Sequence, residues 1–333
     1  MKNQTPDQIV EESPEVERNK NEYLLPASVL IATLILAAVW IYTSGPKVSG
    51  SRIAGAPDTQ ETQESLLDQK VLPSEGVILP VVWGDLGAKL VSVSAIDADK
   101  FKAVYDKREA FTDEYKELLL GQSDGRLKMT KDNAGYLLNL FWALGLASKN
   151  PILDFGEMQD PRYGGTQNFA STAGWTMANG NPMDHYSRHK FFDLKPEQQA
   201  LVERVSAGIY RPCCGNSTHF PDCNHGMAML GLLELMASQG VSEQDMWKAA
   251  LAVNSYWFPD NYMTIAAYME NKGVEWKEAN PQEILGVSYS SATGYAWIAS
   301  QVNQLEQQRG GSGCGVDTER PIQTQRQQGG CGV

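Results

Sequence analysis

The sequence predicts a mostly α-helical fold, in which a single N-terminal transmembrane helix is followed by one helical globular domain with a long irregular loop. Three observations support this prediction. An uncharged apolar run lies near the start of the chain, and capped segments with helical spacing follow through most of its length. One stretch rich in glycine, asparagine and proline interrupts those segments.

The start of the chain is predicted to be a membrane anchor. Residues 1–22 are polar, with six acidic and three basic residues, and are expected to be disordered. Residues 24–42 form 19 positions without a charge, and at about 1.5 Å per residue such a helix spans roughly 28 Å, close to the hydrocarbon core of a bilayer. Trp40 and Tyr42 lie where interfacial aromatic residues are expected. A cleaved signal peptide and a buried core helix are the alternatives, but a signal peptide would have a basic start and a shorter apolar core.

The charges that flank the apolar run do not fix its orientation. Arg18 and Lys20 precede it. Lys47 and Arg52 follow it, so the positive-inside rule favours neither side. Because an N-terminal anchor followed by a long chain usually exports that chain, we expect a single-pass membrane protein with an extracytoplasmic C-terminal domain.

The net charge of −12 at pH 7 limits the possible partners. An acidic chain without a basic stripe argues against nucleic acid and against anionic lipid head groups. We therefore predict two partners. One is the membrane, which residues 24–42 would contact, and the other is a metal ion. No pattern in the sequence names a protein partner.

Local patterns divide the rest of the chain. Residues 43–75 are rich in Gly, Ser, Thr and Gln and are predicted to form a flexible stalk, and residues 308–333 a disordered Gly/Gln/Cys tail. Between them we expect one helical domain, over residues 76–307. Residues 77–83 fit either a strand or a buried helix. Caps and apolar spacing predict helices over 97–105, 112–120, 133–148, 196–209, 242–256 and 293–307, with a shorter helix from 281.

Residues 151–184 form the long irregular loop, which is either functional or a surface excursion. Asp154, Glu157 and Asp160 could act there in acid–base chemistry, although carboxylates in a polar loop are usually solvated. The sequence has no nucleophile elbow, no P-loop and no dinucleotide-binding motif in strand-to-helix context. It therefore leaves open whether the protein is an enzyme.

Cysteine and histidine are concentrated in one segment. All four histidines lie between positions 185 and 225, and three of the five cysteines lie between 213 and 223. Thiolate and imidazole are the donors that zinc, copper(I) and iron centres use. We therefore predict a site for a soft or borderline metal ion, copper or zinc. Its candidate ligands are Cys213, Cys214, His219, Cys223 and His225.

The residues after this cluster support the prediction. Residues 226–239 are apolar around almost the whole circumference of a helix, which predicts a helix buried in the domain. Cys223 and His225 would lie at its N-terminus, where unpaired N–H groups and the helix dipole favour a thiolate. Met227 and Met229 could add thioether ligands, but methionine in a buried helix usually serves packing.

Other interpretations of the thiols stay open. The spacing matches no standard zinc module and no covalent haem motif. In an oxidising compartment Cys213 or Cys214 could form a structural disulfide with Cys223, and the protein could then be a cell-envelope interaction protein. Alternatively, Cys223 could be the nucleophile of a thiol-dependent oxidoreductase that Cys213 or Cys214 resolves, or these two could form a vicinal disulfide.

Four further residues could extend the cluster. His185 and His189 are four positions apart and would share one face of a helix, although two solvated histidines are an equal alternative. Cys314 and Cys331 lie between glycines in the predicted tail and could reach back to the cluster or be incidental.

Part of the chain resembles a known family. Pro212-Cys213-Cys214-Gly215 and Asp222-Cys223, followed by a helix and a second short helix to residue 259, resemble the small bacterial exported lipoproteins named for a Pro-Cys-Tyr-Cys-Gly-Cys motif. This chain lacks the middle tyrosine, the further cysteines and a lipid-attachment cysteine. The resemblance, which covers residues 212–259, implies an exported module that is associated with a metal or with thiol chemistry.

Overall fold

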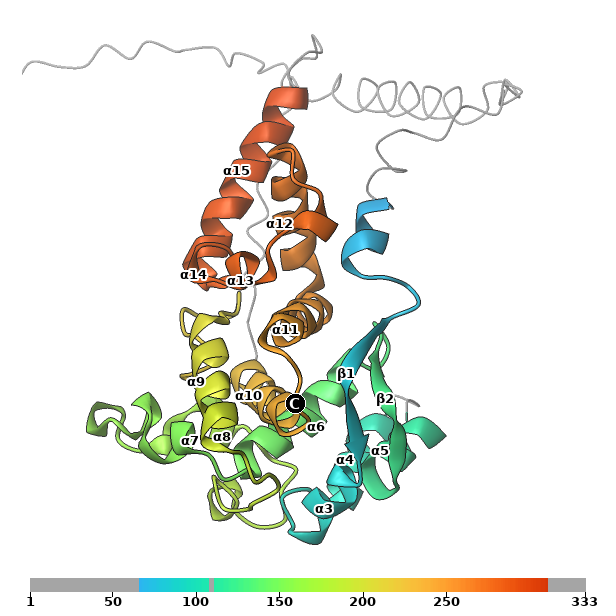
Figure 1. Ribbon diagram of the computed structural model, residues 1–333, viewed down its shortest axis with the longest axis vertical. Helices are drawn as coiled ribbons and strands as arrows, with labels where there is room; N and C mark the ends of the chain where they lie inside the picture. Colours follow the sequence, from blue (N-terminus) through green and yellow to red (C-terminus); the bar gives the residue numbers. More distant parts are fainter. Residues whose placement is uncertain (1–65, 108–110, 311–333) are drawn as a thin grey trace, which may run out of the picture. The chain divides into compact units, whose positions relative to one another are not determined.

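The computed structural model describes residues 66–107 and 111–310, which form a mostly helical domain with one small antiparallel sheet (Figure 1). The predicted mostly α-helical class is thus confirmed for this part of the chain. No helix in the described ranges is long and apolar enough to cross a membrane. The predicted anchor at 24–42 lies outside those ranges, as do the predicted disordered N-terminus and most of the predicted stalk and tail.

The end of the predicted stalk belongs to the folded domain. Residues 66–71 are helical, and the side chains of Leu67 and Val71 are buried in the core. These two positions are four apart and therefore lie on one face of the helix. This part of the segment predicted as stalk therefore packs with the core, although its polar composition does not reveal the short apolar face.

The sheet consists of β1 (Val77–Gly84) and β2 (Ser123–Met129), which pair antiparallel with Val77 opposite Met129. In β1 the side chains of Leu79, Val81 and Trp83 are buried, whereas Ile78 is exposed. This alternation is that of a strand with one face on the core. The segment at 77–83 is therefore a strand, and β2 adds a second strand that the sequence did not predict.

Three helices lie between the strands in sequence: α3 (Leu86–Ser92), α4 (Ala98–Asp106) and α5 (Asp113–Leu120). Local capping explains where two of them begin. The side chain of Asp97 accepts hydrogen bonds from the backbone N–H groups of Asp99 and Lys100 at the start of α4. Thr112 accepts one from Tyr115 at the start of α5. Both predicted helix starts are confirmed.

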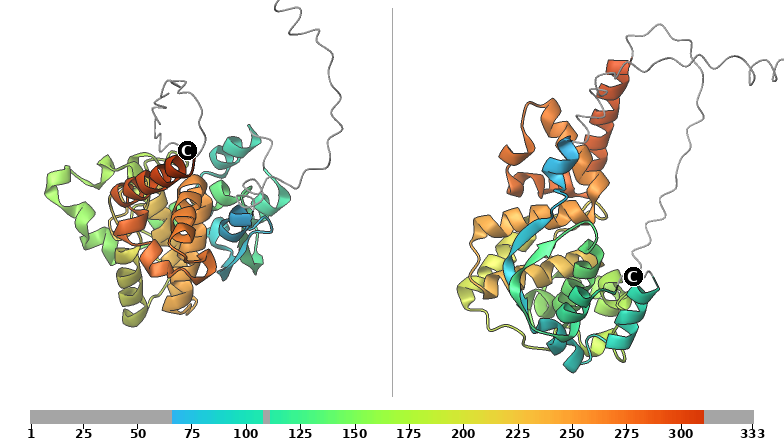
Figure 2. Two further views of the ribbon diagram at one scale, coloured as in Figure 1. Left: turned by 90° about the horizontal axis from the view of Figure 1, so that it is seen from above. Right: turned by 90° about the vertical axis from the view of Figure 1, so that its right-hand side faces the viewer.

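Two buried helices, α6 (Ala134–Ala147) and α10 (Asn224–Ser238), form the centre of the domain and pack side by side (Figures 1 and 2). Nearly every side chain of both is buried. They approach closely through glycine: a Cβ on Gly145 would overlap the carbonyl oxygen of Met227, and one on Gly231 would lie 2.5 Å from the carbonyl oxygen of Phe141. The predicted buried helix after His225 is confirmed.

The remaining helices pack around this pair and beyond it. They are α9 (Pro196–Gly208), α11 (Glu243–Trp257), α12 (Pro259–Asn271), α13 (Pro281–Ile284), α14 (Val287–Ser290) and α15 (Ala292–Gly310). Helix α9 packs on α10, and α12 packs on α15 (Figure 1). The sequence did not predict α12, because Pro259 follows Phe258 at the end of α11 and Pro-Asp-Asn is typical of a turn.

The predicted irregular loop contains short helices, α7 (Pro151–Phe155) and α8 (Ala170–Ala173), and several 3₁₀ turns. It is not a simple surface excursion, since the indole of Trp175 is buried 5.0 Å from that of Trp142 on α6. Asp154 forms a salt bridge with Lys149 at 2.8 Å, which favours a structural role for this carboxylate. Asp160 is paired with Arg162, and Glu157 is exposed.

Candidate metal centre

The cysteine-rich segment is a loop that connects α9 to α10. The backbone of Tyr210 pairs with that of Ser217, and the N–H of Thr218 donates to the carbonyl of Ile209 at 2.7 Å. Residues 212–215 therefore form the tip of a short turn. The carbonyl of Cys214 accepts a hydrogen bond of 2.9 Å from the N–H of Ala292, the first residue of α15. The first two contacts close the turn, and the last one ties its tip to α15.

Three of the five predicted ligands come together directly. The sulfurs of Cys213 and Cys223 and a ring nitrogen of His225 lie within 4.8 Å of one another. The two sulfurs are 3.8 Å apart. A second group with the same spread contains Cys214, Asp222 and Cys223, so Cys223 belongs to both groups. In this structure all three thiols are free.

The N-terminus of α10 positions the buried part of the cluster. Cys223 is the N-cap residue in extended conformation, and His225 lies in the first turn. The imidazole packs against the ring of Phe258 at 4.4 Å and that of Trp257 at 5.7 Å. Its Nδ1 is buried and has no hydrogen-bond partner. A buried nitrogen without a partner is costly, so an imidazole in this state is a suitable donor for a metal ion.

Arg211 is a functional candidate that the sequence did not indicate. Its side chain is completely buried, and Nη2 donates to Asp222 Oδ1 at 2.7 Å. Nε and Nη1 have no partner. The guanidinium lies on the first turn of α10, where a Cβ on Gly226 would be 2.7 Å from Arg211 Cζ. A buried cation next to the positive end of a helix requires negative charge close by.

The cysteines supply part of that negative charge. Burial alone would lower the pKa of Arg211, but the nearby thiol groups of Cys223 and Cys214 and the Asp222 carboxylate outweigh burial and raise it. Arg211 can therefore act as a permanent counter-charge to thiolates in this site.

Both carboxylate oxygens of Asp222 accept hydrogen bonds from residues of the loop, so we do not count Asp222 among the metal ligands. Its Oδ1 accepts from Arg211, and its Oδ2 accepts from Asn216 Nδ2 at 2.8 Å. Burial raises the pKa of its carboxyl group in spite of the attraction of Arg211. We therefore assign Asp222 to orienting Arg211 and closing the turn.

The three thiols are not equivalent. Hydrogen bonds from Cys213 and Cys214 hold the pKa of Cys223 well below its ordinary value, and Arg211 and His225 add to this effect against the opposing effect of burial. The pKa of Cys213 is raised, chiefly because its thiol donates to those of Cys214 and Cys223. Cys223 is therefore the first of the three to become a thiolate.

The other predicted residues lie elsewhere or have other roles. His219 belongs to neither donor group found in the described residues; its backbone N–H donates to the carbonyl of Ser206 near the end of α9. Proximity in sequence to the cysteines therefore does not bring its side chain into either donor group of the described residues. Met227 and Met229 are fully buried among apolar side chains of the core, as expected for packing.

His185 and His189 form a separate pair in a turn and not on a helix. His185 Nδ1 lies 3.2 Å from His189 Nε2, and His185 Nε2 lies 3.2 Å from the carbonyl oxygen of Asn179. The carbonyl can only accept, so His185 donates from Nε2 and accepts from His189 at Nδ1. Burial lowers the pKa of His189, and His185 and Arg188 lower it further. These hydrogen bonds favour a structural role for the two histidines in stabilising the turn.

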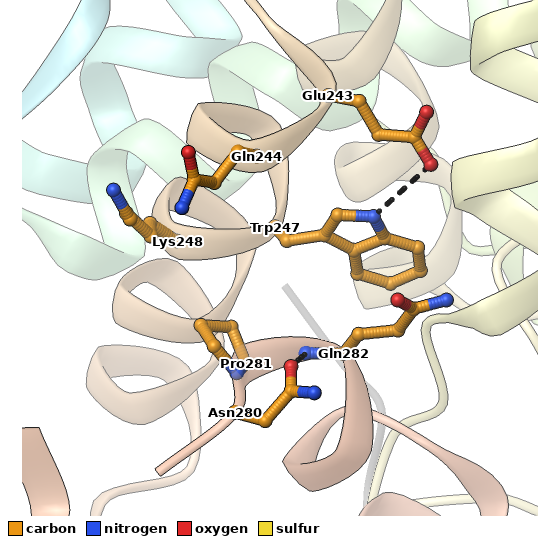
Figure 3. Close-up of a pocket in the computed structure, with 7 residues that line it drawn as sticks. All are labelled: Glu243, Gln244, Trp247, Lys248, Asn280, Pro281 and Gln282. Atoms are coloured by element: carbon orange, nitrogen blue, oxygen red, sulfur yellow. Dashed lines mark hydrogen bonds between the residues drawn. The ribbon is translucent and has the colours of Figure 1, made fainter. Parts of the chain in front are cut away.

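A cleft of about 380 Å³ lies between α11 and α13 (Figure 3). The indole of Trp247 lies at its centre, with its Nε1 3.5 Å from Glu243 Oε1. Its other lining residues are Gln244, Lys248, Asn280, Pro281 and Gln282. The lining contains no thiol and no imidazole, so we place the candidate site at the cysteine cluster and not in this cleft.

Comparison of the chain with protein-family models, with curated proteins and with solved structures finds no match. The thiol, imidazole and carboxylate groups of the site are close enough to hold a metal ion. Thiolate and imidazole donors favour zinc or copper(I) over magnesium or calcium.

Proposed function

We propose that this protein binds one zinc or copper(I) ion through Cys213, Cys223 and His225, with Cys214 as the fourth donor. The separation of 3.8 Å between the sulfurs of Cys213 and Cys223 carries the proposal. Two thiolates bound to one tetrahedral zinc ion at about 2.3 Å lie roughly 3.8 Å apart. The sulfurs of a disulfide lie only about 2.05 Å apart.

Two further observations support this donor set. The sulfur of Cys214 lies within 4.8 Å of that of Cys223, whereas both oxygens of Asp222 are already hydrogen-bonded. Three thiolates and one divalent ion leave a net negative charge, which the buried guanidinium of Arg211 offsets. The metal would supply a strong positive charge that keeps these thiols deprotonated.

The location of the site is also a proposal. We infer that residues 24–42 anchor the chain in a membrane and that the metal-binding domain lies on the extracytoplasmic side. The apolar run and the resemblance of residues 212–259 to exported lipoproteins support this placement. In intact cells, a membrane-impermeant maleimide should label Cys314 and Cys331, which are not proposed metal ligands, without lysis if the domain is exported. Labelling that requires lysis would place the domain in the cytoplasm and contradict the topology, but not the metal site.

Metal analysis of the purified full-length protein tests the metal site. The protein is prepared without a metal-binding tag, and Cys314 and Cys331 are changed to Ser so that each remaining thiol belongs to the cluster. We expect about one zinc or copper ion per chain and slow alkylation of the thiols until a chelator removes the ion. A protein that takes up no metal after reduction, although circular dichroism shows it folded, would rule the proposal out.

A further inference from the structure

The thiols of the proposed site differ in their access to solvent. Cys213 is exposed, Cys214 is partly exposed and Cys223 is buried at the start of α10. The exposed and the buried thiol are the pair whose sulfurs lie 3.8 Å apart. One donor of the site can therefore meet a dissolved oxidant while in contact with a second donor.

We propose that a hydroperoxide oxidises the site, joins Cys213 to Cys223 in a disulfide and thereby releases the metal ion. This inference rests on the proposed metal binding and adds its regulation. The ion would be held under reducing conditions and delivered when a peroxide is present.

The order of events follows from exposure and contact. The peroxide reaches Cys213 first, because its thiol is the exposed one on the tip of the loop. In the metal-bound site Cys213 is a thiolate, and its sulfur attacks the peroxide, so that the O–O bond breaks. Cys213 becomes a sulfenic acid, and the rest of the peroxide leaves as an alcohol, or as water when the oxidant is hydrogen peroxide.

The second step uses the buried cysteine. The Cys223 thiolate attacks the sulfenic sulfur, the S–S bond forms, and the S–O bond breaks with loss of water after protonation. In sum, two thiolates, one hydroperoxide and two protons give one disulfide, one alcohol and one water. The two electrons that the sulfurs lose reduce the peroxide, and the metal keeps its oxidation state.

The oxidised site lacks enough donors to keep the ion. The disulfide removes two thiolates, which leaves Cys214 and His225. Both oxygens of Asp222 are already hydrogen-bonded, to Arg211 and to Asn216. Two donors hold zinc far more weakly than four.

The test uses the full-length chain with Cys314 and Cys331 changed to Ser, reduced and loaded with zinc. Hydrogen peroxide is added, zinc release is followed with a chromogenic chelator, and the disulfide is located by peptide mapping. We expect one zinc released for each Cys213–Cys223 disulfide, a mass lower by about 2 Da, and zinc binding restored by dithiothreitol.

Matched variants of the two neighbouring cysteines test the order of events. Cys214→Ser removes one proposed donor and should bind zinc more weakly, but its reactive pair is intact, so peroxide should still form the Cys213–Cys223 disulfide at the rate of the parent. In Cys213→Ser the exposed thiol is absent, and the rate of peroxide-dependent release should fall by about tenfold or more. Circular dichroism verifies that both variants are folded, and peptide mapping of the parent decides the pairing even when a variant loads poorly.

The outcomes separate the two proposals. Zinc that binds and is retained after oxidation, or that leaves with a disulfide to Cys214, overturns the redox inference and leaves metal binding intact. A reduced, folded protein that never binds zinc or copper(I) overturns both.

Discussion

The guanidinium of Arg211 is completely buried, and its Nη2 donates to Asp222 Oδ1 at 2.7 Å. The thiols of Cys223 and Cys214 lie close enough to Arg211 to affect its pKa. The pair therefore contributes both to the stability of the loop and to the balance of charge in the site. Removing one partner from a buried ion pair leaves the other charge without compensation.

We predict that Arg211→Met lowers the free energy of unfolding by about 3 kcal/mol. The reason is that Asp222, whose side chain is only 21% exposed, loses its partner. Chemical denaturation of the reduced, metal-free protein measures the change. The matched control is Arg204→Met, which breaks the exposed Arg204–Glu243 pair and should change stability little. Equal losses in both variants would contradict the role assigned to Arg211.

The two histidines nearest to the cysteines in sequence should differ in metal binding. His225→Asn removes a proposed ligand with a buried, unpartnered Nδ1 and should weaken zinc binding by at least about tenfold. His219→Asn should leave zinc binding unchanged, because His219 lies outside both donor groups of the described structure. Competition with a chelator of known affinity measures both. A larger loss in His219→Asn than in His225→Asn would mean that the ligand set is assigned incorrectly.

Adding a single methyl group at the contact between α6 and α10 should lower the stability of the protein. Gly145→Ala places a Cβ on the carbonyl oxygen of Met227, a backbone atom that can move only with the helix. We expect a loss of roughly 3 kcal/mol in the free energy of unfolding or failure to fold. Gly135→Ala, at an exposed position of the same helix with no atom within 4 Å of the added Cβ, should stabilise the protein by up to about 1 kcal/mol. Thermal unfolding compares the two, and similar melting temperatures would contradict the close approach.

Much of the fold could be predicted because its determinants are local. Asp97, Thr112 and Ser242 cap helices through hydrogen bonds to N–H groups two or three residues away, so their helix starts are visible in the sequence. The strand β2 was missed for the opposite reason. Ser123–Met129 has no regular apolar alternation, and its pairing with β1 depends on residues about 40 to 50 positions earlier in the chain.

The site was predictable in composition but not in geometry. The concentration of cysteine and histidine indicated Cys213, Cys214, Cys223 and His225, whereas the separation of His219 from them depends on how the turn folds back on α9. Arg211 carries no signal of its own in the sequence, since most arginines are exposed. Its burial against Gly226 is a property of the folded state alone.

Glu234 gives the last prediction, because it is a carboxyl group in the middle of the buried helix α10. Its Oε2 accepts a hydrogen bond from the hydroxyl of Ser148, and its Oε1 has no partner. Burial raises the pKa of Glu234 from 4.5 to about 8. The folded state therefore keeps the proton over a range in which the unfolded state releases it.

The pH dependence of stability follows from this difference. Below pH 4.5 the folded and the unfolded state both hold the proton of Glu234, and its contribution to stability is complete. As the pH rises from 4.5 to about 8, Glu234 ionises only in the unfolded state, which lowers the free energy of that state relative to the folded one. The free energy of unfolding should fall across this window, by up to about 1.4 kcal/mol per pH unit. Glu234→Gln, which cannot ionise, should remove that slope, whereas the exposed Glu117→Gln should keep it. Urea denaturation of the three reduced, metal-free proteins from pH 5 to pH 8 measures the effect. Parallel curves for the wild type and Glu234→Gln would show that Glu234 is ionised in the folded state, since its proton would then be released equally with and without folding.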